Sequence, residues 1–177
     1  MNNYKIVFMG TPDFGIPSLN ELYKQGYEVE AVYTQPDRVN KRGNKVQFSA
    51  VKQFALEHDI TIYQPNSLKD EKELDVLRAL NPDLIIVIAY GKILPQAVLD
   101  IPKYGVINVH ASLLPKYRGA APVQRSIIDG EETTGVTIMQ LDAGMDTGNI
   151  IAEKSVFITP HMTSEDLFDV LSNVGAK

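Results

Sequence analysis

Residues 83–89 read Asp-Leu-Ile-Ile-Val-Ile-Ala, and this stretch decides the fold. Six apolar residues follow Asp83, without the alternation of apolar and polar residues that is typical of a strand with one solvent-exposed face. Such a run is typical of a strand in a mainly parallel sheet, because helices cover both faces of that kind of sheet. The run therefore predicts a buried strand near the middle of an α/β domain.

The segments on either side of this run alternate between strand and helix patterns. Strands are expected at residues 5–9, 28–34, 60–63, 83–89, 105–110, 134–140 and 149–158. Helices are expected at 14–25, 48–58, 71–80, 122–128 and from about 163 onward, where Thr-Ser-Glu-Asp fits a capping box. The polar segment 35–47 is expected to be a loop. This order predicts an α/β fold with a Rossmann-like, open, mostly parallel sheet and helices on both faces.

Length and composition exclude several classes of protein. The 177 residues fit one domain, and the absence of cysteine excludes disulfides, thiolate metal sites and a cysteine nucleophile. With 17 basic and 22 acidic residues the net charge is −5, so a wholly basic nucleic-acid coat is excluded, although a local basic patch is not. The longest apolar run is too short to cross a bilayer and the first residues lack a signal-peptide layout, so we expect a cytoplasmic protein.

The turn after the first strand does not favour a nucleotide cofactor. It reads Gly10-Thr-Pro-Asp-Phe-Gly15, with proline and aspartate where a dinucleotide's pyrophosphate would approach the backbone. There is no P-loop motif either. The three histidines, His58, His110 and His161, are widely separated, so we expect no metal site.

The strand at 105–110 ends with chemically useful side chains. Asn108 and His110 are two residues apart and should face the same side, at the strand end where open α/β sheets bind ligands. An amide can hold a developing oxyanion and an imidazole can move a proton, which suits acyl transfer. Taken alone, an Asn-x-His pair is more often structural.

Residues 108–119, Asn-Val-His-Ala-Ser-Leu-Leu-Pro-Lys-Tyr-Arg-Gly, resemble the signature of the enzymes that use 10-formyltetrahydrofolate. The resemblance implies that Asn108 and His110 are catalytic, together with an aspartate from a later turn. The turn at 141–148 supplies Asp146, and Asp142 is the rival carboxylate. From the residues alone, either aspartate could simply form the turn.

Within these enzymes the chain is most similar to the methionyl-tRNA formyltransferase family. The matching segments are 8–14, 34–38, 89–95 and 112–115. The resemblance implies a formyltransferase fold, no metal, and transfer of a formyl group from 10-formyltetrahydrofolate to the α-amine of initiator methionyl-tRNA through a tetrahedral intermediate. It implies cofactor contacts from Ala89, Tyr90, Gly91, Lys92, Ser112, Leu113, Leu114, Pro115, Gln140, Asp142 and Gly144. Ile93 is expected in the core.

The segment 38–47 is basic and resembles the family's tRNA-facing loop. The implied tRNA contacts are Arg38, Lys41, Arg42 and Lys45. Arg118 and Arg125 are expected either to extend this basic surface or to pair with carboxylates.

Two rival functions remain open. One is formyl transfer to a small amine, such as glycinamide ribonucleotide or an amino sugar, and the other is folate or tRNA binding without catalysis. The family also carries a C-terminal OB-like domain that holds tRNA, and no residues of this chain correspond to it. We therefore expect residues 1–177 to be the catalytic domain of a truncated, monomeric chain that binds tRNA weakly.

Overall fold

A computed structural model describes residues 4–39 and 46–177 of the chain. Within these residues, seven strands form one open sheet in the order β5-β2-β1-β6-β7-β8-β9. The strands are β1 (Lys5–Gly10), β2 (Glu28–Tyr33), β5 (Thr61–Tyr63), β6 (Leu84–Ile88), β7 (Val106–His110), β8 (Thr133–Gln140) and β9 (Ile150–Phe157). The strands from β5 to β7 pair in parallel, whereas β8 and β9 are antiparallel, which confirms a mostly parallel sheet.

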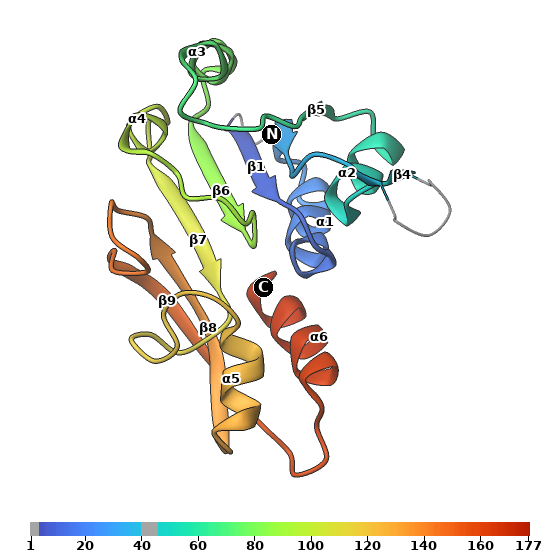
Figure 1. Ribbon diagram of the computed structural model, residues 1–177, viewed down its shortest axis with the longest axis vertical. Helices are drawn as coiled ribbons and strands as arrows, with labels where there is room; N and C mark the ends of the chain where they lie inside the picture. The colour runs from blue at the N-terminus through green and yellow to red at the C-terminus, as the bar shows by residue number, and fades with distance from the viewer. Residues whose placement is uncertain (1–3, 40–45) are drawn as a thin grey trace.

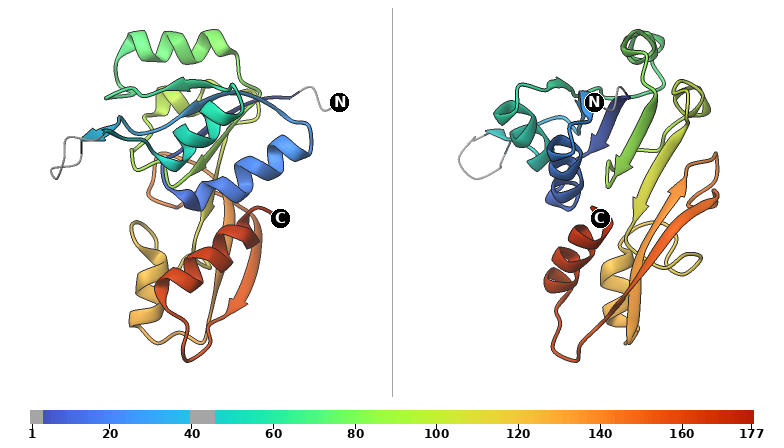
Figure 2. Two further views of the ribbon diagram at one scale, coloured as in Figure 1. Left: turned by 90° about the vertical axis from the view of Figure 1, so that its right-hand side faces the viewer. Right: turned by 180° about the vertical axis from the view of Figure 1, so that it is seen from behind.

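Helices cover both faces of the sheet (Figure 1). The short 3-10 turn η1 (Asp13–Gly15) leads into α1, and the helices are α1 (Ile16–Lys24), α2 (Ala50–Glu57), α3 (Glu71–Leu80), α4 (Gln96–Leu99), α5 (Pro122–Ile128) and α6 (Ser164–Gly175). Residues of α1, α2, α5 and α6 share one buried cluster, and residues of α3 and α4 share the other. Figures 1 and 2 show α1 and α6 side by side, and the two helices are in contact. No helix in the described part of the chain is long and apolar enough to cross a membrane.

The apolar run in β6 is explained by its position between these two clusters. Ile86 and Ile88 pack into the cluster below α1 and α6, while Ile85 and Val87 pack into the cluster on the α3 side. Side chains alternate between the faces of a strand, so a strand buried on both faces needs an apolar residue at every position. The structure confirms the expectation drawn from this stretch.

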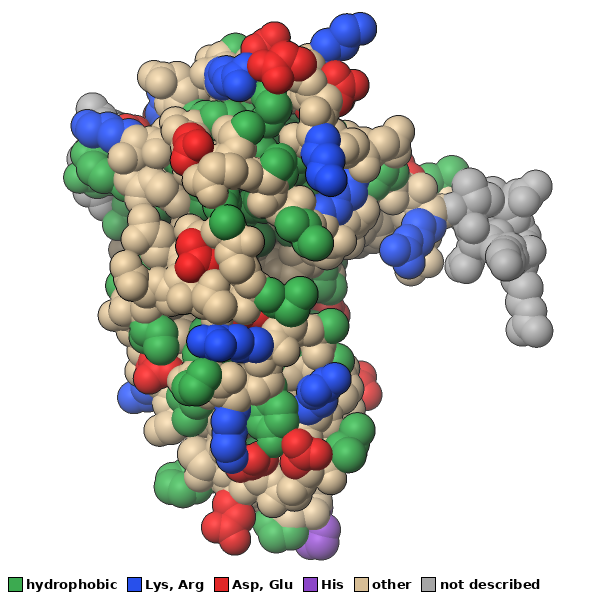
Figure 3. All heavy atoms as spheres, turned by 60° about the vertical axis from the view of Figure 1, so that its left-hand side comes forward, with side chains coloured by type: hydrophobic (Ala, Val, Ile, Leu, Met, Phe, Trp, Pro, Cys, Tyr) green, Lys and Arg blue, Asp and Glu red, His purple; other side chains and the backbone are tan. Residues whose placement is uncertain are grey.

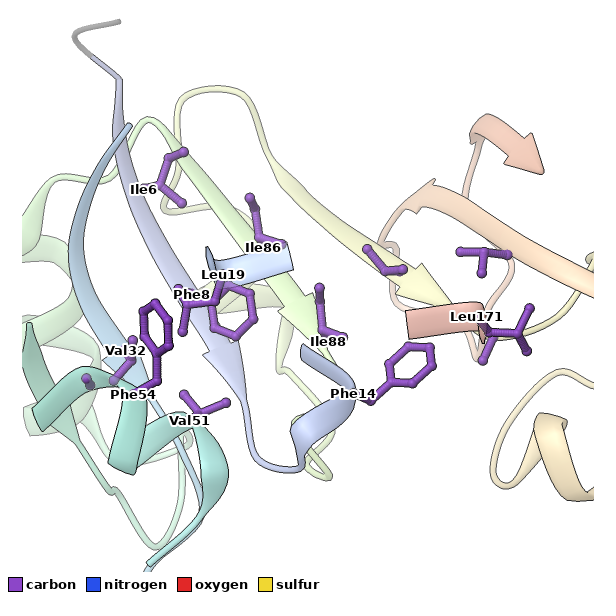
Figure 4. Close-up of a cluster of buried hydrophobic side chains, with 14 of the residues drawn as sticks. Ile6, Phe8, Phe14, Leu19, Val32, Val51, Phe54, Ile86, Ile88 and Leu171 are labelled. Carbon is purple, nitrogen blue, oxygen red and sulfur yellow. The ribbon is translucent and has the colours of Figure 1, made fainter. Parts of the chain in front are cut away.

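The cluster on the α1 side joins the two ends of the chain (Figure 4). Phe8 of β1 and Leu19 of α1 are fully buried, and Phe14 of η1 reaches toward Leu171 of α6. The ring of Phe14 also meets Phe168 edge-on, with 4.9 Å between ring centroids. Burial of these rings fixes α6 against the sheet, because large apolar side chains contribute most of the favourable free energy of packing.

Side chains cap the N-termini of α2, α3 and α6, and the cap of α6 was expected from the sequence. Thr163 and Asp166 form the reciprocal capping box at the start of α6, as the sequence predicted. Ser49 caps α2 by accepting a hydrogen bond from the backbone N–H of Lys52, and Asp70 caps α3 in the same way. These side chains satisfy backbone donors that helix geometry leaves unpaired.

Two sequence expectations were wrong in detail, and one short helix was missed. The segment 35–47 is not wholly a loop, because β3 (Arg38–Val39) pairs antiparallel with β4 (Val46–Gln47). The four-residue helix α4 was not predicted, since it is too short to show periodicity. Ile93, expected in the core, is 86% exposed. Its apolar side chain lies in a segment that lines the cavity described next.

Candidate active site

A cavity of about 650 Å³ opens beside the carboxyl ends of β6 and β7. Its lining is mostly apolar and comes from residues 89–94, 108–111, 119–124 and 141–146, with Phe14, Val87, Leu99 and Phe168. This edge of a parallel sheet is where α/β proteins bind ligands, and a mainly apolar cavity with a few polar groups suits a small organic molecule. The cavity therefore brings together segments that are far apart in the sequence.

Asn108 and His110 both line this cavity from β7. Their strand is hydrogen-bonded to β6 on one side and to β8 on the other, so the backbone beneath them is held on both edges. His110 is only 7% exposed. A group with fixed position and limited contact with water is well suited to act on a bound substrate.

Asp146 is the carboxylate that faces His110. Its Oδ2 atom lies 3.7 Å from His110 Nδ1, and the two side chains are 14% and 8% exposed. The backbone N–H of Gly119 donates to the same oxygen at 2.7 Å, and Arg118 Nε donates to the backbone carbonyl of Asp146 at 2.9 Å. The segment 118–119 thus holds both the carboxylate and the backbone of Asp146.

Asp142, the rival carboxylate, has a different environment. Its Oδ1 atom accepts hydrogen bonds from the backbone N–H of Gly144 at 2.9 Å and from Thr147 Oγ1 at 2.7 Å. These are bonds within the turn, of the kind by which aspartate stabilises a turn. Of the two candidates, Asp146 is therefore the one placed to interact with the imidazole.

The other ring nitrogen of His110 is fixed by a backbone group. Nε2 lies 2.9 Å from the carbonyl oxygen of Tyr117. A carbonyl only accepts hydrogen bonds, so Nε2 is the donor and carries the proton in the neutral ring. Nδ1 is consequently the nitrogen that faces Asp146.

The residues of segment 89–92 line one part of the cavity. The carbonyl of Tyr90 accepts two hydrogen bonds of 3.0 Å, from Thr11 Oγ1 and from Gln35 Nε2. The ring of Tyr90 is buried on the α3 side of the sheet, and this burial raises the pKa of its phenol to about 12. The phenol is therefore neutral at physiological pH, and the ring anchors the wall.

Lys92 is tied to a neighbouring segment. Its amine donates to the backbone carbonyls of Pro65 and Asn66. Partial burial lowers the pKa of this amine. Both Lys92 and Ala89 line the cavity, as do Gly91, Asp142 and Gly144, so six of the expected cofactor-contact residues, Tyr90 included, meet there.

The remaining expected cofactor contacts do not line the cavity. Ser112 is fully buried and donates to the carbonyl of Lys116 at 2.6 Å, and the N–H of Leu114 donates to Thr137 Oγ1 at 3.1 Å. The other members of this group are Leu113, which lies over Gly135, and Pro115 and Gln140, which are exposed. The segment 112–115 builds the turn that leads to Tyr117, and direct cofactor contact by its residues stays a prediction.

Several groups at the cavity were not found from the sequence. The carbonyl of Tyr117 and the N–H of Gly119 are backbone groups, which no residue type reveals. Phe168 comes from α6, after β9, and no motif in its neighbourhood indicates that it lines the cavity. The run Gly-Ala-Ala-Pro at 119–122 is a signal that was available, because small residues permit close approach to a ligand.

The expected tRNA-contact residues are only partly described. Arg38 is exposed on β3, whereas Lys41, Arg42 and Lys45 lie outside the described residues. The base of this segment is held by Asp37, whose carboxylate meets Lys52 Nζ at 2.5 Å and Gln64 Nε2 at 2.8 Å.

The distribution of charge gives limited support to a basic surface. Figure 3 shows cationic and anionic side chains interspersed on one face of the molecule. Arg118 bonds a backbone carbonyl rather than a carboxylate, and Arg125 is exposed on α5. Across residues 4–39 and 46–177, no group of three or more His, Asp or Glu side chains is placed to hold a metal ion, and the expected absence of a metal stays a prediction.

The fold and this site define the class of protein. The chain belongs to the formyl transferase family, whose sequence model matches residues 4–177. Among its curated relatives, the methionyl-tRNA formyltransferase of Clostridium perfringens (strain 13 / Type A) is 56% identical over 174 residues, and that of Caldanaerobacter subterraneus subsp. tengcongensis is 52% identical over 174 residues. Each alignment covers 98% of this chain and 56% of the relative, so the chain spans little more than half of their length.

Solved structures support the fold independently. The crystal structure of phosphoribosylglycinamide formyltransferase from Bacillus halodurans superposes with a TM-score of 0.80 at 23% identity. The superposition covers 97% of this chain and 89% of that one. At this level of identity the likeness shows a shared formyltransferase fold.

Proposed function

We propose that this chain contains the catalytic centre of a methionyl-tRNA formyltransferase. In this reaction the formyl group of 10-formyltetrahydrofolate passes to the α-amine of initiator methionyl-tRNA. The proposal is carried by one observation: Asn108, His110 and Asp146 converge on a single cavity, with His110 and Asp146 facing each other. The printed function of relatives more than 50% identical over almost the whole chain supports the choice of amine.

Asn108 acts on the developing negative charge. The amine attacks the formyl carbon, a new C–N bond forms, and the charge collects on the formyl oxygen in a tetrahedral intermediate. The amide of Asn108 donates a hydrogen bond to that oxygen. Such a donor lowers the barrier by about 3 kcal/mol, because it is already in place before the charge appears.

His110 and Asp146 carry out the proton transfer that accompanies this step. Nδ1 of His110 takes the proton that the attacking amine loses and returns one to the departing N10 when the old C–N bond breaks. The carboxylate of Asp146 favours the charged imidazolium that forms between these two events. Its position near Nδ1, at 3.7 Å, supports this role.

The cavity fits a folate as formyl donor. Its volume of about 650 Å³ and apolar lining suit a flat heteroaromatic group. Residues 89–92 and 141–144 line the cavity, and we assign their backbone groups to the edge of a pterin. Ala89, Gly91, Lys92, Asp142 and Gly144 are the residues we assign to this contact.

The decisive experiment is a formylation assay with two amines. The protein is incubated with 10-formyltetrahydrofolate and methionyl-tRNA, and the product is examined for formylmethionine. Glycinamide ribonucleotide, the amine of the nearest rival function, is tested in parallel. We expect formylation of the tRNA and not of the nucleotide, and the reverse result would overturn the proposal.

The basic segment provides a second test. Arg42→Ala should raise the KM for methionyl-tRNA and leave the KM for the folate unchanged, because phosphate contacts act on the nucleic acid alone. Lys154→Ala removes an exposed positive charge from β9 and is the matched control. An equal effect of both variants would show that only overall charge matters.

A further inference from the structure

Tyr117 links the imidazole of the site to an ion pair outside it. Its backbone carbonyl accepts the hydrogen bond from His110 Nε2 at 2.9 Å. At the far end of the same residue, the phenol donates to Glu131 Oε1 at 2.7 Å. Lys116 Nζ meets the same carboxylate oxygen at 2.7 Å. Tyr117 therefore connects the imidazole of His110, through its backbone carbonyl, with the carboxylate of Glu131, which follows α5.

The backbone of Tyr117 needs such an anchor. Its φ of +57° lies in the left-handed region, which is unfavourable for a residue other than glycine. A conformation of this kind persists only where the surrounding contacts hold it. The bond from the phenol to a charged carboxylate is one of the stronger kinds of hydrogen bond, and it fixes the ring and with it the direction of the carbonyl.

The charges around this bond keep it intact near neutral pH. The hydrogen bond to Glu131 raises the pKa of the Tyr117 phenol, with burial and Asp129 acting in the same direction. Hydrogen bonds from Lys116 and Tyr117 hold the pKa of the Glu131 carboxyl below its usual value. The phenol thus stays a donor and the carboxylate stays an anion.

The direction of the Tyr117 carbonyl decides which nitrogen of His110 is free. While the carbonyl accepts from Nε2, the neutral ring must be the Nε2–H tautomer, and its lone pair is on Nδ1. Nδ1 faces Asp146 Oδ2. If the carbonyl moved away, the ring could also carry its proton on Nδ1 and would then be unable to accept one there.

We propose that Tyr117, anchored by Glu131, is a positioning residue that holds His110 in the Nε2–H tautomer and so leaves Nδ1 free to exchange a proton. The kinetic consequence rests on the proposed formyl transfer, but the tautomer itself does not depend on it. Tyr117 acts here through its backbone and is not assigned any contact with substrate.

Four variants separate this role from a general structural one. Tyr117→Phe and Glu131→Leu remove the anchoring bond, while Glu131→Gln keeps an oxygen that accepts from the phenol. Lys116→Met removes the other partner of Glu131 and leaves the bond between Tyr117 and Glu131 in place. We expect kcat to fall about tenfold in the first two variants with KM for both substrates nearly unchanged, because the reacting geometry and not binding is disturbed. Glu131→Gln should restore most of kcat, and Lys116→Met should match the wild type.

The tautomer is measured without any substrate. Nitrogen-15 NMR distinguishes a protonated from an unprotonated ring nitrogen, and His110→Asn identifies the signals of His110 among the three histidines. For the neutral ring we expect Nε2 protonated and Nδ1 unprotonated in the wild type, and a mixture of tautomers in Tyr117→Phe and Glu131→Leu. Circular dichroism confirms that each variant is folded, and if Tyr117→Phe does not fold, the Glu131→Leu and Glu131→Gln pair makes the same comparison.

The outcomes are distinguishable. A wild-type protein whose neutral His110 ring carries its proton on Nδ1, or anchor variants with wild-type spectra and wild-type kcat, would overturn the positioning role. A wild-type protein that transfers no formyl group would refute the proposed function, and the spectra would still decide the role of Tyr117.

Discussion

Nδ1 of His110 and Oδ2 of Asp146 lie 3.7 Å apart, although they belong to a strand end and to a separate turn. This separation is longer than a hydrogen bond but short enough for electrostatic attraction between an imidazolium and a carboxylate. The carboxylate is held by the N–H of Gly119 and not by the imidazole. The position of Asp146 relative to His110 therefore depends on the contacts that hold the 141–148 turn in place.

Removing the charge of Asp146 should abolish most activity. Asp146→Asn retains the size of the side chain and an oxygen that accepts from Gly119, but it cannot stabilise an imidazolium. We expect kcat for formyl transfer to fall by about 10²- to 10⁴-fold. Asp142→Asn is the comparison: Oδ1 of Asp142 bonds within its own turn, so this variant should act on the KM for the folate that Asp142 is proposed to contact and leave kcat nearly unchanged. A loss of the same size in both variants would contradict the assignment of Asp146.

Two glycines in this turn should respond differently to alanine. A Cβ at Gly148 would lie 1.8 Å from the backbone oxygen of Gln140, which cannot rotate away. A Cβ at Gly144 would meet the Thr147 hydroxyl at 2.0 Å, and that side chain can change rotamer. We expect Gly148→Ala to lower kcat and the midpoint of thermal unfolding, and Gly144→Ala to change the midpoint much less.

The bond network at Asp37 should make stability depend on pH. Hydrogen bonds from Lys52 and Gln64 hold the pKa of Asp37 below its ordinary value of 3.8. A depressed pKa means that the stabilisation is complete above 3.8 and is lost as pH falls through the lower, folded value. The free energy of unfolding of the wild type should therefore exceed that of Asp37→Asn near neutral pH, and the difference should shrink in acid.

Urea unfolding at a series of pH values measures this difference. Asp169→Asn, at an exposed position of α6, is the control and should leave the acid dependence unchanged. A difference between the wild type and Asp37→Asn that stayed constant into strong acid would show that the network is not stabilising.

The packing of α6 gives a stability prediction. Leu171 is fully buried between the helix and the sheet. Leu171→Ala should lower the free energy of unfolding by about 2–5 kcal/mol, from lost burial and the remaining void. Asn173→Ala, on the exposed side of the same helix, should change it by less than about 0.5 kcal/mol. Denaturant unfolding of both variants provides the measurement.

The order of helices and strands was predictable because periodic burial requires a matching pattern of apolar residues in the sequence. Both faces of β6 are covered, so its residues are apolar throughout, and Thr163 caps α6 as the capping box predicted. The same reasoning wrongly placed Ile93 in the core, because an apolar residue beside a cavity cannot be distinguished from a core residue by sequence alone. Strands of two residues, such as β3, are too short to be recognised at all.

The candidate site was predictable only in its side chains. The motif around His110 and the turn containing Asp146 indicated which residues to examine, and the structure brings them together. The groups that orient them could not be predicted in this way. The carbonyl of Tyr117 and the N–H of Gly119 exist at every residue, and only the three-dimensional path of the chain selects them.

The two hydrogen bonds to the carbonyl of Tyr90 have a consequence for inhibitor chemistry. A carbonyl oxygen has two lone pairs, and Thr11 and Gln35 already use both. A compound that places a donor against this wall of the cavity gains nothing at Tyr90 unless it displaces one of those side chains. Donor groups directed at residues 89–92 therefore need an acceptor other than the carbonyl of Tyr90.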